Sequence, residues 1–186
     1  MFIIGFILMM NIILSGCTQK DDTLDRTMEL RNRMLTANGC TFTAEITADF
    51  GEELYSFTMN CSCDHNGNMA FEVMEPDAIS GITGQFGDTY SDLTFDGYVL
   101  AFPRLADGRV TPVSAPWIFV QSLRSGYICG YLQNEDETAV MINDTYEDEA
   151  LELTIWLDMK NIPEFAEIVW QGRRVLSLRI NDFAFM

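Results

Sequence analysis

Cysteine is the side chain of this sequence with the clearest covalent chemistry, and Cys17 stands at a sharp change of composition. Residues 2–14 are apolar apart from Asn11, and a polar run follows Cys17. The two residues directly before it, Ser15 and Gly16, are small enough for a narrow peptidase cleft. A thiol at this place can carry diacylglycerol, so the pattern predicts cleavage of an export signal and attachment of lipid at Cys17.

The residues Leu-Ser-Gly-Cys at positions 14–17 resemble the lipobox of bacterial lipoproteins, which is specific when it directly ends an apolar run. The resemblance implies a signal peptide at 1–16, a lipidated tether at 17–24, and a chain held on the extracytoplasmic face of the cell membrane. The apolar run of about 13 residues is short for a membrane span, which needs roughly 20. The two acyl chains of one diacylglycerol on Cys17 are enough for stable anchoring. The alternative is an ordinary secretory signal in which Cys17 is incidental.

The remaining cysteines, Cys40, Cys61, Cys63 and Cys129, are an even number in a chain predicted to be exported, which allows disulfides. Alternation in the first predicted hairpin places the first three on its inner face. A symmetric turn about Gly51 sets Cys40 opposite Cys63 and leaves Cys61 to reach Cys129. The alternative is four buried free thiols. Since only one residue separates Cys61 from Cys63 and the chain has one histidine, we expect no zinc site.

An enzyme needs a base, a nucleophile or a metal, and the sequence offers few candidates. The one histidine, His65, precedes Asn-Gly in a predicted turn. Two acidic clusters, Glu135–Glu137 and Asp144–Glu149, lack the spacing of a calcium loop and are typical of solvated hairpin tips. No GxSxG, P-loop or GxGxxG motif is present. We therefore expect no enzymatic activity, no metal and no cofactor.

Net charge narrows the classes of partner. The chain has 28 acidic and 11 basic side chains, which gives a formal charge of −17. Such a charge repels nucleic acid and anionic headgroups, so we expect no nucleic-acid partner and a membrane attachment that depends on acyl chains. About 170 residues remain after cleavage, which suits one domain, at 25–186.

Two helices and many short strands must position these side chains. Residues 25–35 carry apolar side chains among charges, as an amphipathic helix does. Ser114 is predicted to cap a second helix that presents Trp117, Val120 and other apolar residues before Gly126 ends it. Elsewhere apolar and polar residues alternate, as in an antiparallel sheet with one wet face. The predicted strands are 40–49, 54–63, 69–75, 80–86, 90–95, 98–102, 127–133, 138–144, 150–159, 165–170 and 174–183.

About ten or eleven strands and two helices predict a mainly β, α+β fold, which is a strongly curved antiparallel sheet or unclosed β-barrel under a helical lid. The turns at His65-Asn66-Gly67 and Asp96-Gly97 are hairpin signals. A curved sheet of this size encloses volume. The sequence leaves open whether side chains fill that volume or a ligand occupies it.

Over residues 25–186 the order of elements resembles the LolA/LolB-like family of lipoprotein carriers and acceptors. The matching stretches are Phe42 to Phe57, Glu75-Pro76 with Ile79-Ser80-Gly81-Ile82, Leu93 to Gly97, and Ile162-Pro163-Glu164 to Ile180. The resemblance implies a helical lid over an apolar cavity that takes acyl chains. No motif identifies the arginine that holds such a lid closed, although Arg104 and Arg109 precede the second helix. The candidate cavity-lining residues are Phe42, Ile46, Phe57, Met59, Phe71, Val73, Trp117 and Val120.

A lipid-anchored chain is more similar to the acceptor of this family than to its soluble carrier. It is also similar to a Gram-positive relative, the germination lipoprotein of spore-forming anaerobes. We therefore expect a non-enzymatic envelope lipoprotein that binds acyl chains or lipidated proteins in an apolar cavity. The alternative is an accessory lipoprotein or scaffold that docks a cell-envelope protein such as a cell-wall amidase.

Overall fold

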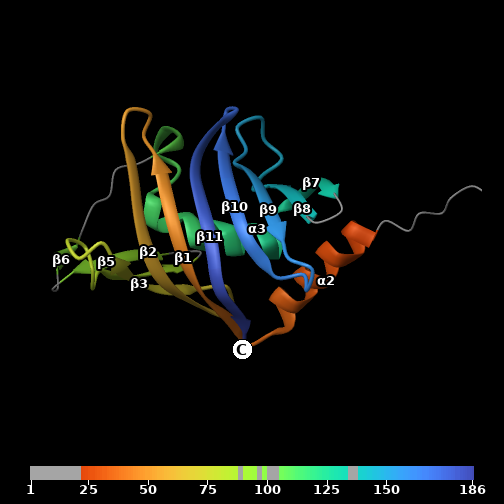
Figure 1. The fold of residues 1–186 in the computed structure, drawn as a ribbon, viewed down its shortest axis with the longest axis horizontal. Helices are drawn as coiled ribbons and strands as arrows, with labels where there is room; N and C mark the ends of the chain where they lie inside the picture. Colours follow the sequence, from red (N-terminus) through yellow and green to blue (C-terminus); the bar gives the residue numbers. More distant parts are fainter. Residues whose placement is uncertain (1–21, 88–89, 96–97, 100–104, 134–137) are drawn as a thin grey trace, which may run out of the picture.

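The computed structural model of the chain describes residues 22–87, 90–95, 98–99, 105–133 and 138–186. Its framework is one 11-stranded sheet in the order β6-β5-β4-β3-β2-β1-β11-β10-β9-β8-β7 (Figure 1). Each neighbouring pair of strands is antiparallel. The strands are β1 (Gly39–Asp49), β2 (Leu54–Asp64), β3 (Met69–Glu75), β4 (Thr83–Gly87), β5 (Tyr90–Phe95), β6 (Tyr98–Val99), β7 (Tyr127–Gln133), β8 (Thr138–Asn143), β9 (Glu152–Leu157), β10 (Pro163–Trp170) and β11 (Arg173–Phe185).

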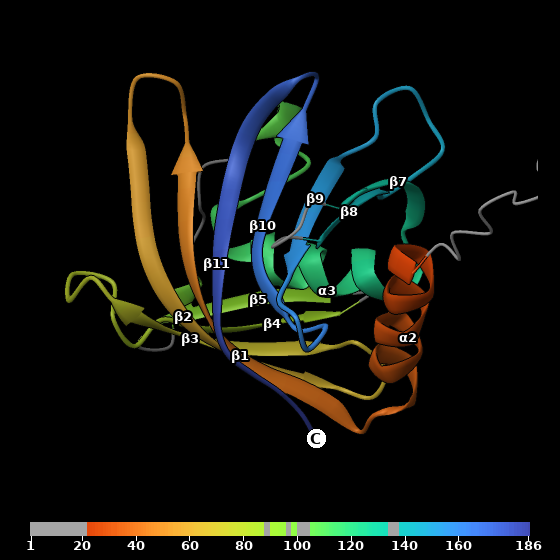
Figure 2. The same cartoon turned by 45° about the vertical axis from the view of Figure 1, so that its right-hand side comes forward.

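Among the described residues, strands β6 and β7 are the two ends of this sheet and do not pair with each other, so the barrel is unclosed. Figure 2 shows the strong curvature: β11, β10 and β9 rise on one side, while β3, β4 and β5 run across the base. Helix α3 (Ala115–Ser125) lies within the curve, and α2 (Asp22–Thr36) stands at the side near β7. The predicted fold class is confirmed. None of the helices among the described residues is both long and apolar enough to cross a membrane.

Period-two alternation explains why these segments form strands. In β1 the side chains of Cys40, Phe42, Ala44, Ile46 and Ala48 are buried, and the residues between them are partly or fully exposed. The same alternation in β9 ends one step earlier than predicted. Leu157 is the last buried residue, and Met159, which the predicted strand 150–159 places two positions further on the same face, is 91% exposed in the turn before β10. The predicted strand 150–159 is therefore too long at its C-terminal end.

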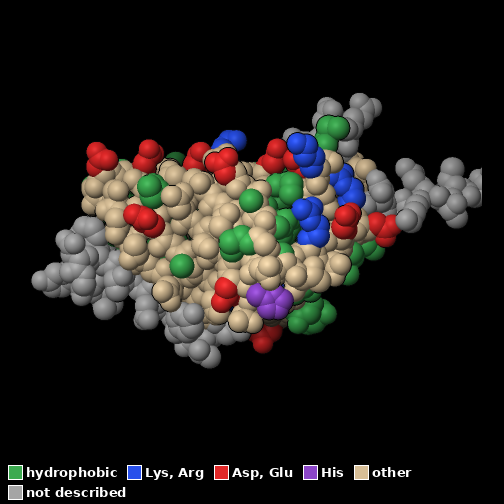
Figure 3. All heavy atoms as spheres, turned by 90° about the horizontal axis from the view of Figure 1, so that it is seen from below, with side chains coloured by type: hydrophobic (Ala, Val, Ile, Leu, Met, Phe, Trp, Pro, Cys, Tyr) green, Lys and Arg blue, Asp and Glu red, His purple; other side chains and the backbone are tan. Residues whose placement is uncertain are grey.

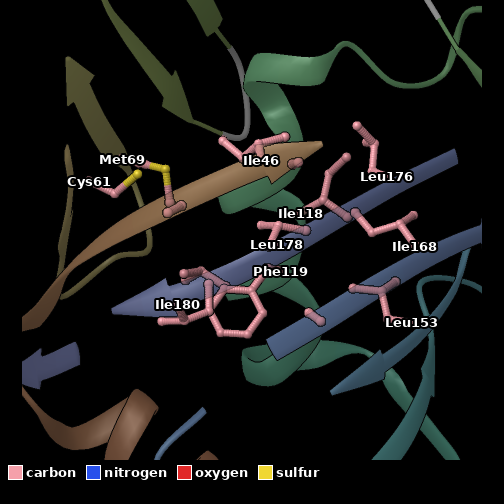
Figure 4. Close-up of a cluster of buried hydrophobic side chains, with 14 of the residues drawn as sticks. Ile46, Cys61, Met69, Ile118, Phe119, Leu153, Ile168, Leu176, Leu178 and Ile180 are labelled. Atoms are coloured by element: carbon pink, nitrogen blue, oxygen red, sulfur yellow. The ribbon is translucent and has the colours of Figure 1, made fainter. Parts of the chain in front are cut away.

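Helix α3 completes the core by packing its apolar side against the inner face of the sheet. Phe119 is fully buried and lies in Figure 4 close to Ile180 of β11. Its ring meets Phe42 of β1 edge to face, with 5.8 Å between ring centroids. Edge-to-face pairs of this kind are stabilised by the aromatic quadrupole in addition to buried area.

Two details at helix starts differ from the sequence predictions. Helix α2 begins at Asp22 rather than residue 25, so the segment 17–24 is not a tether along its whole length. Thr23 is buried, and its polar groups are paired: its hydroxyl donates to Gln133 Oε1 at 2.6 Å, and its carbonyl accepts from the Thr27 hydroxyl at 2.8 Å. Ser114 precedes α3 as predicted, but its hydroxyl donates to the Thr111 carbonyl instead of capping α3.

Candidate functional site

The predicted cavity-lining residues converge on one place, the space between α3 and the inner face of β1, β2 and β3. Seven of the eight are buried to 7% exposure or less and belong to one apolar cluster, and Trp117 packs against that cluster. These seven are Phe42, Ile46, Phe57, Met59, Phe71, Val73 and Val120. These side chains form one packed cluster between the helix and the sheet, with ring contacts that join β1 to α3 and β4 to α3.

An aromatic row marks the end of this interface nearest the N-terminus of α3. Phe71 of β3 stacks on Phe86 of β4 with 5.5 Å between centroids, and Phe86 stacks on Trp117 of α3 at 6.0 Å. Phe86 is missing from the predicted lining, although its place in the alternation of β4 indicates an inward side chain.

Trp117 carries a polar group that the surrounding protein does not satisfy. Its Nε1 atom is buried and has no hydrogen-bond partner within the described part of the chain. Leaving a buried donor unpaired costs about 1–3 kcal/mol. Such a group is rare in a folded protein and is explained when a ligand or water supplies an acceptor. The indole N–H can therefore donate to an acceptor that a ligand or a water brings beside the Phe71–Phe86–Trp117 row.

Two arginines join α2 to α3 at their C-terminal ends. Arg31 of α2 donates from Nε to the Leu123 carbonyl at 2.8 Å, and from Nη2 to the carbonyls of Gly126 and Ser122 at 2.7 and 3.3 Å. The last carbonyls of a helix lack internal partners, and Leu123 is one of these in α3, whereas the Ser122 carbonyl also accepts from the Gly126 N–H at 2.9 Å. Burial lowers the pKa of Arg31 from its ordinary value, yet a guanidinium keeps its charge in proteins.

Arg124 of α3 makes the reciprocal contact. It donates to the Met34 carbonyl near the end of α2 at 2.7 Å and to the His65 carbonyl in the β2–β3 turn at 3.0 Å. The sequence did not identify either arginine. Arg104 lies outside the described residues, and Arg109 instead pairs with Asp144 at 3.6 Å and lies over the Trp170 ring.

Three of the four predicted core cysteines face inward as expected. Cys40, Cys61 and Cys63 are each at most 4% exposed, and Cys40 is the register partner of Cys63 on the neighbouring strand. All four are free thiols in this structure. Cys129 is exposed on β7 and donates to Asn143 Oδ1 at 3.4 Å. Five strands separate β7 from β2 in the sheet order, so the structure brings Cys40 to Cys63 but does not bring Cys61 to Cys129.

The thiols of Cys40 and Cys63 are not equivalent. The hydrogen bond from Cys63 lowers the pKa of Cys40 against the effect of burial, and the positive charge of Arg124 adds to the lowering. The same hydrogen bond, together with burial, raises the pKa of Cys63. Burial also raises the pKa of Cys61. Cys40 is therefore the thiol of this pair that ionises first.

The other candidate residues occupy turns. His65 is exposed between β2 and β3, and its Nδ1 lies 2.9 Å from the Ala37 carbonyl oxygen. Asp144–Glu149 form the loop before β9, largely exposed, with the Glu149 carbonyl bound to Arg109. Cys17 and Glu135–Glu137, as well as the turn Asp96-Gly97, lie outside the described residues. Among the residues that are described, no three metal-ligating side chains cluster.

The net negative charge is unevenly distributed. On the face shown in Figure 3, most acidic side chains stand along one edge, and basic side chains gather at one end. Much of the surface between them is uncharged.

Comparison with known proteins finds structures of similar arrangement and assigns no activity. No protein-family model matches the chain, and no curated protein matches its sequence. Similar solved structures include a LolA superfamily protein from Nitrosomonas europaea, at 12% identity and a TM-score of 0.43 over 88% of this chain and 93% of that one. A domain named for outer-membrane lipoprotein sorting, from Vibrio parahaemolyticus, has 11% identity and a TM-score of 0.47 over 88% and 92%. The lipoprotein LppX of Mycobacterium tuberculosis has 7% identity and a TM-score of 0.42 over 87% and 93%.

LolA-like structures, the kind that the sequence resembles, are thus among the similar folds. At these identities the likeness concerns the arrangement of helices and strands alone, and function has to be argued from the residues of this chain.

Proposed function

We propose that this protein is a non-enzymatic extracytoplasmic lipoprotein, anchored by diacylglycerol on Cys17, that binds an acyl lipid between α3 and the inner face of the sheet. The observation that supports this function is the unpaired indole N–H of Trp117 at the end of the Phe71–Phe86–Trp117 row. An acyl ester offers both a chain for the aromatic wall and a carbonyl oxygen for the donor.

Energetics favour a long chain over a small polar ligand. Each methylene group removed from water contributes about 0.8 kcal/mol, so ten buried methylenes contribute about 8 kcal/mol. Opening the first turn of α3 and ordering the ligand oppose this gain. A gain of about 8 kcal/mol is much larger than the about 1 kcal/mol of a single hydrogen bond to Trp117, so the buried chain length, more than the polar contact, decides whether a lipid stays bound.

The test is native mass spectrometry of the exported chain carrying Cys17→Ala, so that bound lipid is not confused with the covalent anchor. We expect co-purified lipid in this protein and less lipid after Trp117→Phe, which removes the N–H and keeps an aromatic ring. Trp156→Phe is the matched control, because Trp156 lies on the outer face of β9 against Phe165. A chain without lipid, or equal lipid in both tryptophan variants, would overturn the proposal.

Protein docking is a second candidate function, and one surface favours it. Leu24 and Met28 of α2 are 39% and 48% exposed, and Leu132 of β7 is 54% exposed. Strand β7 ends the sheet order of the described residues, so one of its edges has no strand partner there. An apolar edge strand is a template for pairing with another chain. A photo-crosslinker at Leu132, compared with one at exposed Leu54 on β2, would test for a specific envelope partner.

A further inference from the structure

A groove with a volume of about 760 Å³ crosses the outer face of β1, β2, β3 and β4. These are the strands whose inner face carries Phe42 and Phe71, so the groove lies on the opposite side of the sheet from the proposed lipid site. From its geometry and chemistry, we propose that this groove binds a linear, uncharged glycan. This function is additional to lipid binding and does not depend on it.

The register of the sheet forms the two walls of the groove. One wall is the row Thr41, Ser62, Ala70 and Gln85, which are successive partners across the four strands. All four side chains point away from the core, and the last three are exposed.

The opposite wall is the parallel row Thr43, Asn60, Glu72 and Thr83, formed by the same three pairings. Between the two walls the inward-facing residues contribute only backbone to the floor. Three inter-strand spacings give the groove a length of about 14 Å. A groove of this length fits a short extended chain of ring-shaped units.

A β-bulge closes the end of the groove at β11. The register shifts between Thr41 and Thr43, so Asp182 and Phe183 together oppose Phe42. Asp182 has a φ of +52°, in the left-handed region, and its exposed side chain lines the groove. Bulges re-aim side chains in this way beside binding sites.

The wall chemistry matches the hydroxyl groups of sugars. Hydroxyl and amide side chains both donate and accept hydrogen bonds, and carboxylates accept hydrogen bonds at both of their oxygens. The Thr43 hydroxyl donates to Asn60 Oδ1 at 3.0 Å, which fixes the amide and leaves its Nδ2 hydrogens for a ligand. The groove lining includes Glu72 and Asp182 but no lysine or arginine. In a chain of charge −17 this lining disfavours phosphorylated or sulfated ligands.

Two other ligand classes fit less well. An added peptide strand needs an open sheet edge, but β1 to β4 are interior strands whose two edges are already paired. An acyl chain or apolar helix needs an apolar surface, and Ala70 is the one apolar side chain among the outward-facing groove residues. An uncharged polyhydroxyl chain is therefore the best match.

The test is isothermal titration calorimetry of the full chain in detergent micelles with chitotetraose, cellotetraose and a heparin-derived tetrasaccharide. Ser62→Arg and Ser56→Arg form a matched pair, because both serines are exposed on the outer face of β2 and only Ser62 lines the groove. We expect saturable binding of at least one neutral tetrasaccharide, weakened about tenfold or more by Ser62→Arg and unchanged by Ser56→Arg.

Asn60→Ala provides a second, smaller change within the groove and is expected to weaken binding in the same direction. Thermal unfolding of each variant shows whether it folds. The proposal is overturned if neither neutral glycan binds, if the sulfated glycan binds more tightly, or if the folded groove variants bind as the unaltered chain does. Because these side chains face outward, lipid retention measured on the same variants stays unchanged, which separates this outcome from that of the lipid proposal.

Discussion

Arg31→Met is expected to loosen α2 from α3 and to destabilise the domain by about 3 kcal/mol. Arg31 makes two short hydrogen bonds, at 2.8 and 2.7 Å, and one longer contact at 3.3 Å with carbonyls at the end of α3. A hydrogen bond to a charged group contributes about 1.5–3 kcal/mol. The sum is reduced because water can solvate part of a helix end once the guanidinium is gone.

Thermal unfolding followed by circular dichroism measures the effect. For a domain of this size about 3 kcal/mol lowers Tm by about 6–12 °C. Arg31→Lys keeps the positive charge but replaces the planar guanidinium, which can donate to several carbonyls at once, by a single ammonium group. Its Tm is therefore expected to lie between those of the unaltered chain and Arg31→Met.

The control is Arg179→Met, which removes an exposed arginine whose ion pair with Glu45 spans 3.9 Å. Exposed pairs of this kind contribute little, so its Tm should change by less than about 2 °C. Equal Tm values for Arg31→Met and Arg179→Met would refute the conclusion that the hydrogen bonds of Arg31 stabilise the contact between α2 and α3. If Arg31 also restrains α3 as a lid over the proposed lipid site, Arg31→Met should retain more lipid per folded molecule than the unaltered chain does.

Three further predictions concern the anchor, the thiol pair and acid stability. Cys17→Ala should leave uncleaved precursor or release the chain from membranes. For the unaltered chain, mass spectrometry that finds a cleaved, membrane-free product with unmodified Cys17 would contradict the lipid anchor. Non-reducing peptide mapping of the exported protein should link Cys40 to Cys63, whereas complete alkylation of both would identify them as core thiols. Burial raises the pKa of Asp64, but hydrogen bonds from the Asn68 side chain and from the backbone N–H groups of Asn68 and Asn66 together outweigh it and lower the pKa. Its stabilising effect is therefore present above the unfolded pKa of about 3.9 and lost as pH falls through the lower folded value. Urea titration should show Asp64→Asn as less stable than the unaltered chain at pH 7, with the difference disappearing as the pH falls through the folded pKa of Asp64.

The sheet was predictable from sequence because its signal is local. Alternation along β1 and β2, together with a turn at Gly51, is enough to place Cys40 opposite Cys63, and the structure confirms this register. A shift of the strand register by one residue would have turned the apolar side chains of the strand toward water. The inward direction of Phe42, Phe57 and Phe71 follows from the same rule.

Features that depend on contacts between distant segments were not predictable. The burial of Thr23 depends on Gln133, which is 110 residues away, and so the start of α2 was placed too late. Arg31 looks like an ordinary surface residue of an amphipathic helix until α3 is placed beside it. The unpaired N–H of Trp117 is likewise a property of its surroundings, since nothing in its sequence neighbours removes hydrogen-bond partners.

Strands β1 to β4 present two faces of opposite chemistry. Because side chains alternate, Phe71 faces α3 while its neighbours Ala70 and Glu72 form walls of the outer groove. A substitution on one face leaves the other face's side chains in place, provided that the backbone ladder is kept. The two proposed sites can therefore be tested separately on a single sheet: Trp117→Phe should change lipid retention alone, and Ser62→Arg should change glycan binding alone. A variant of either kind that altered both would show that the sheet itself had shifted, and would count against assigning separate sites to its two faces.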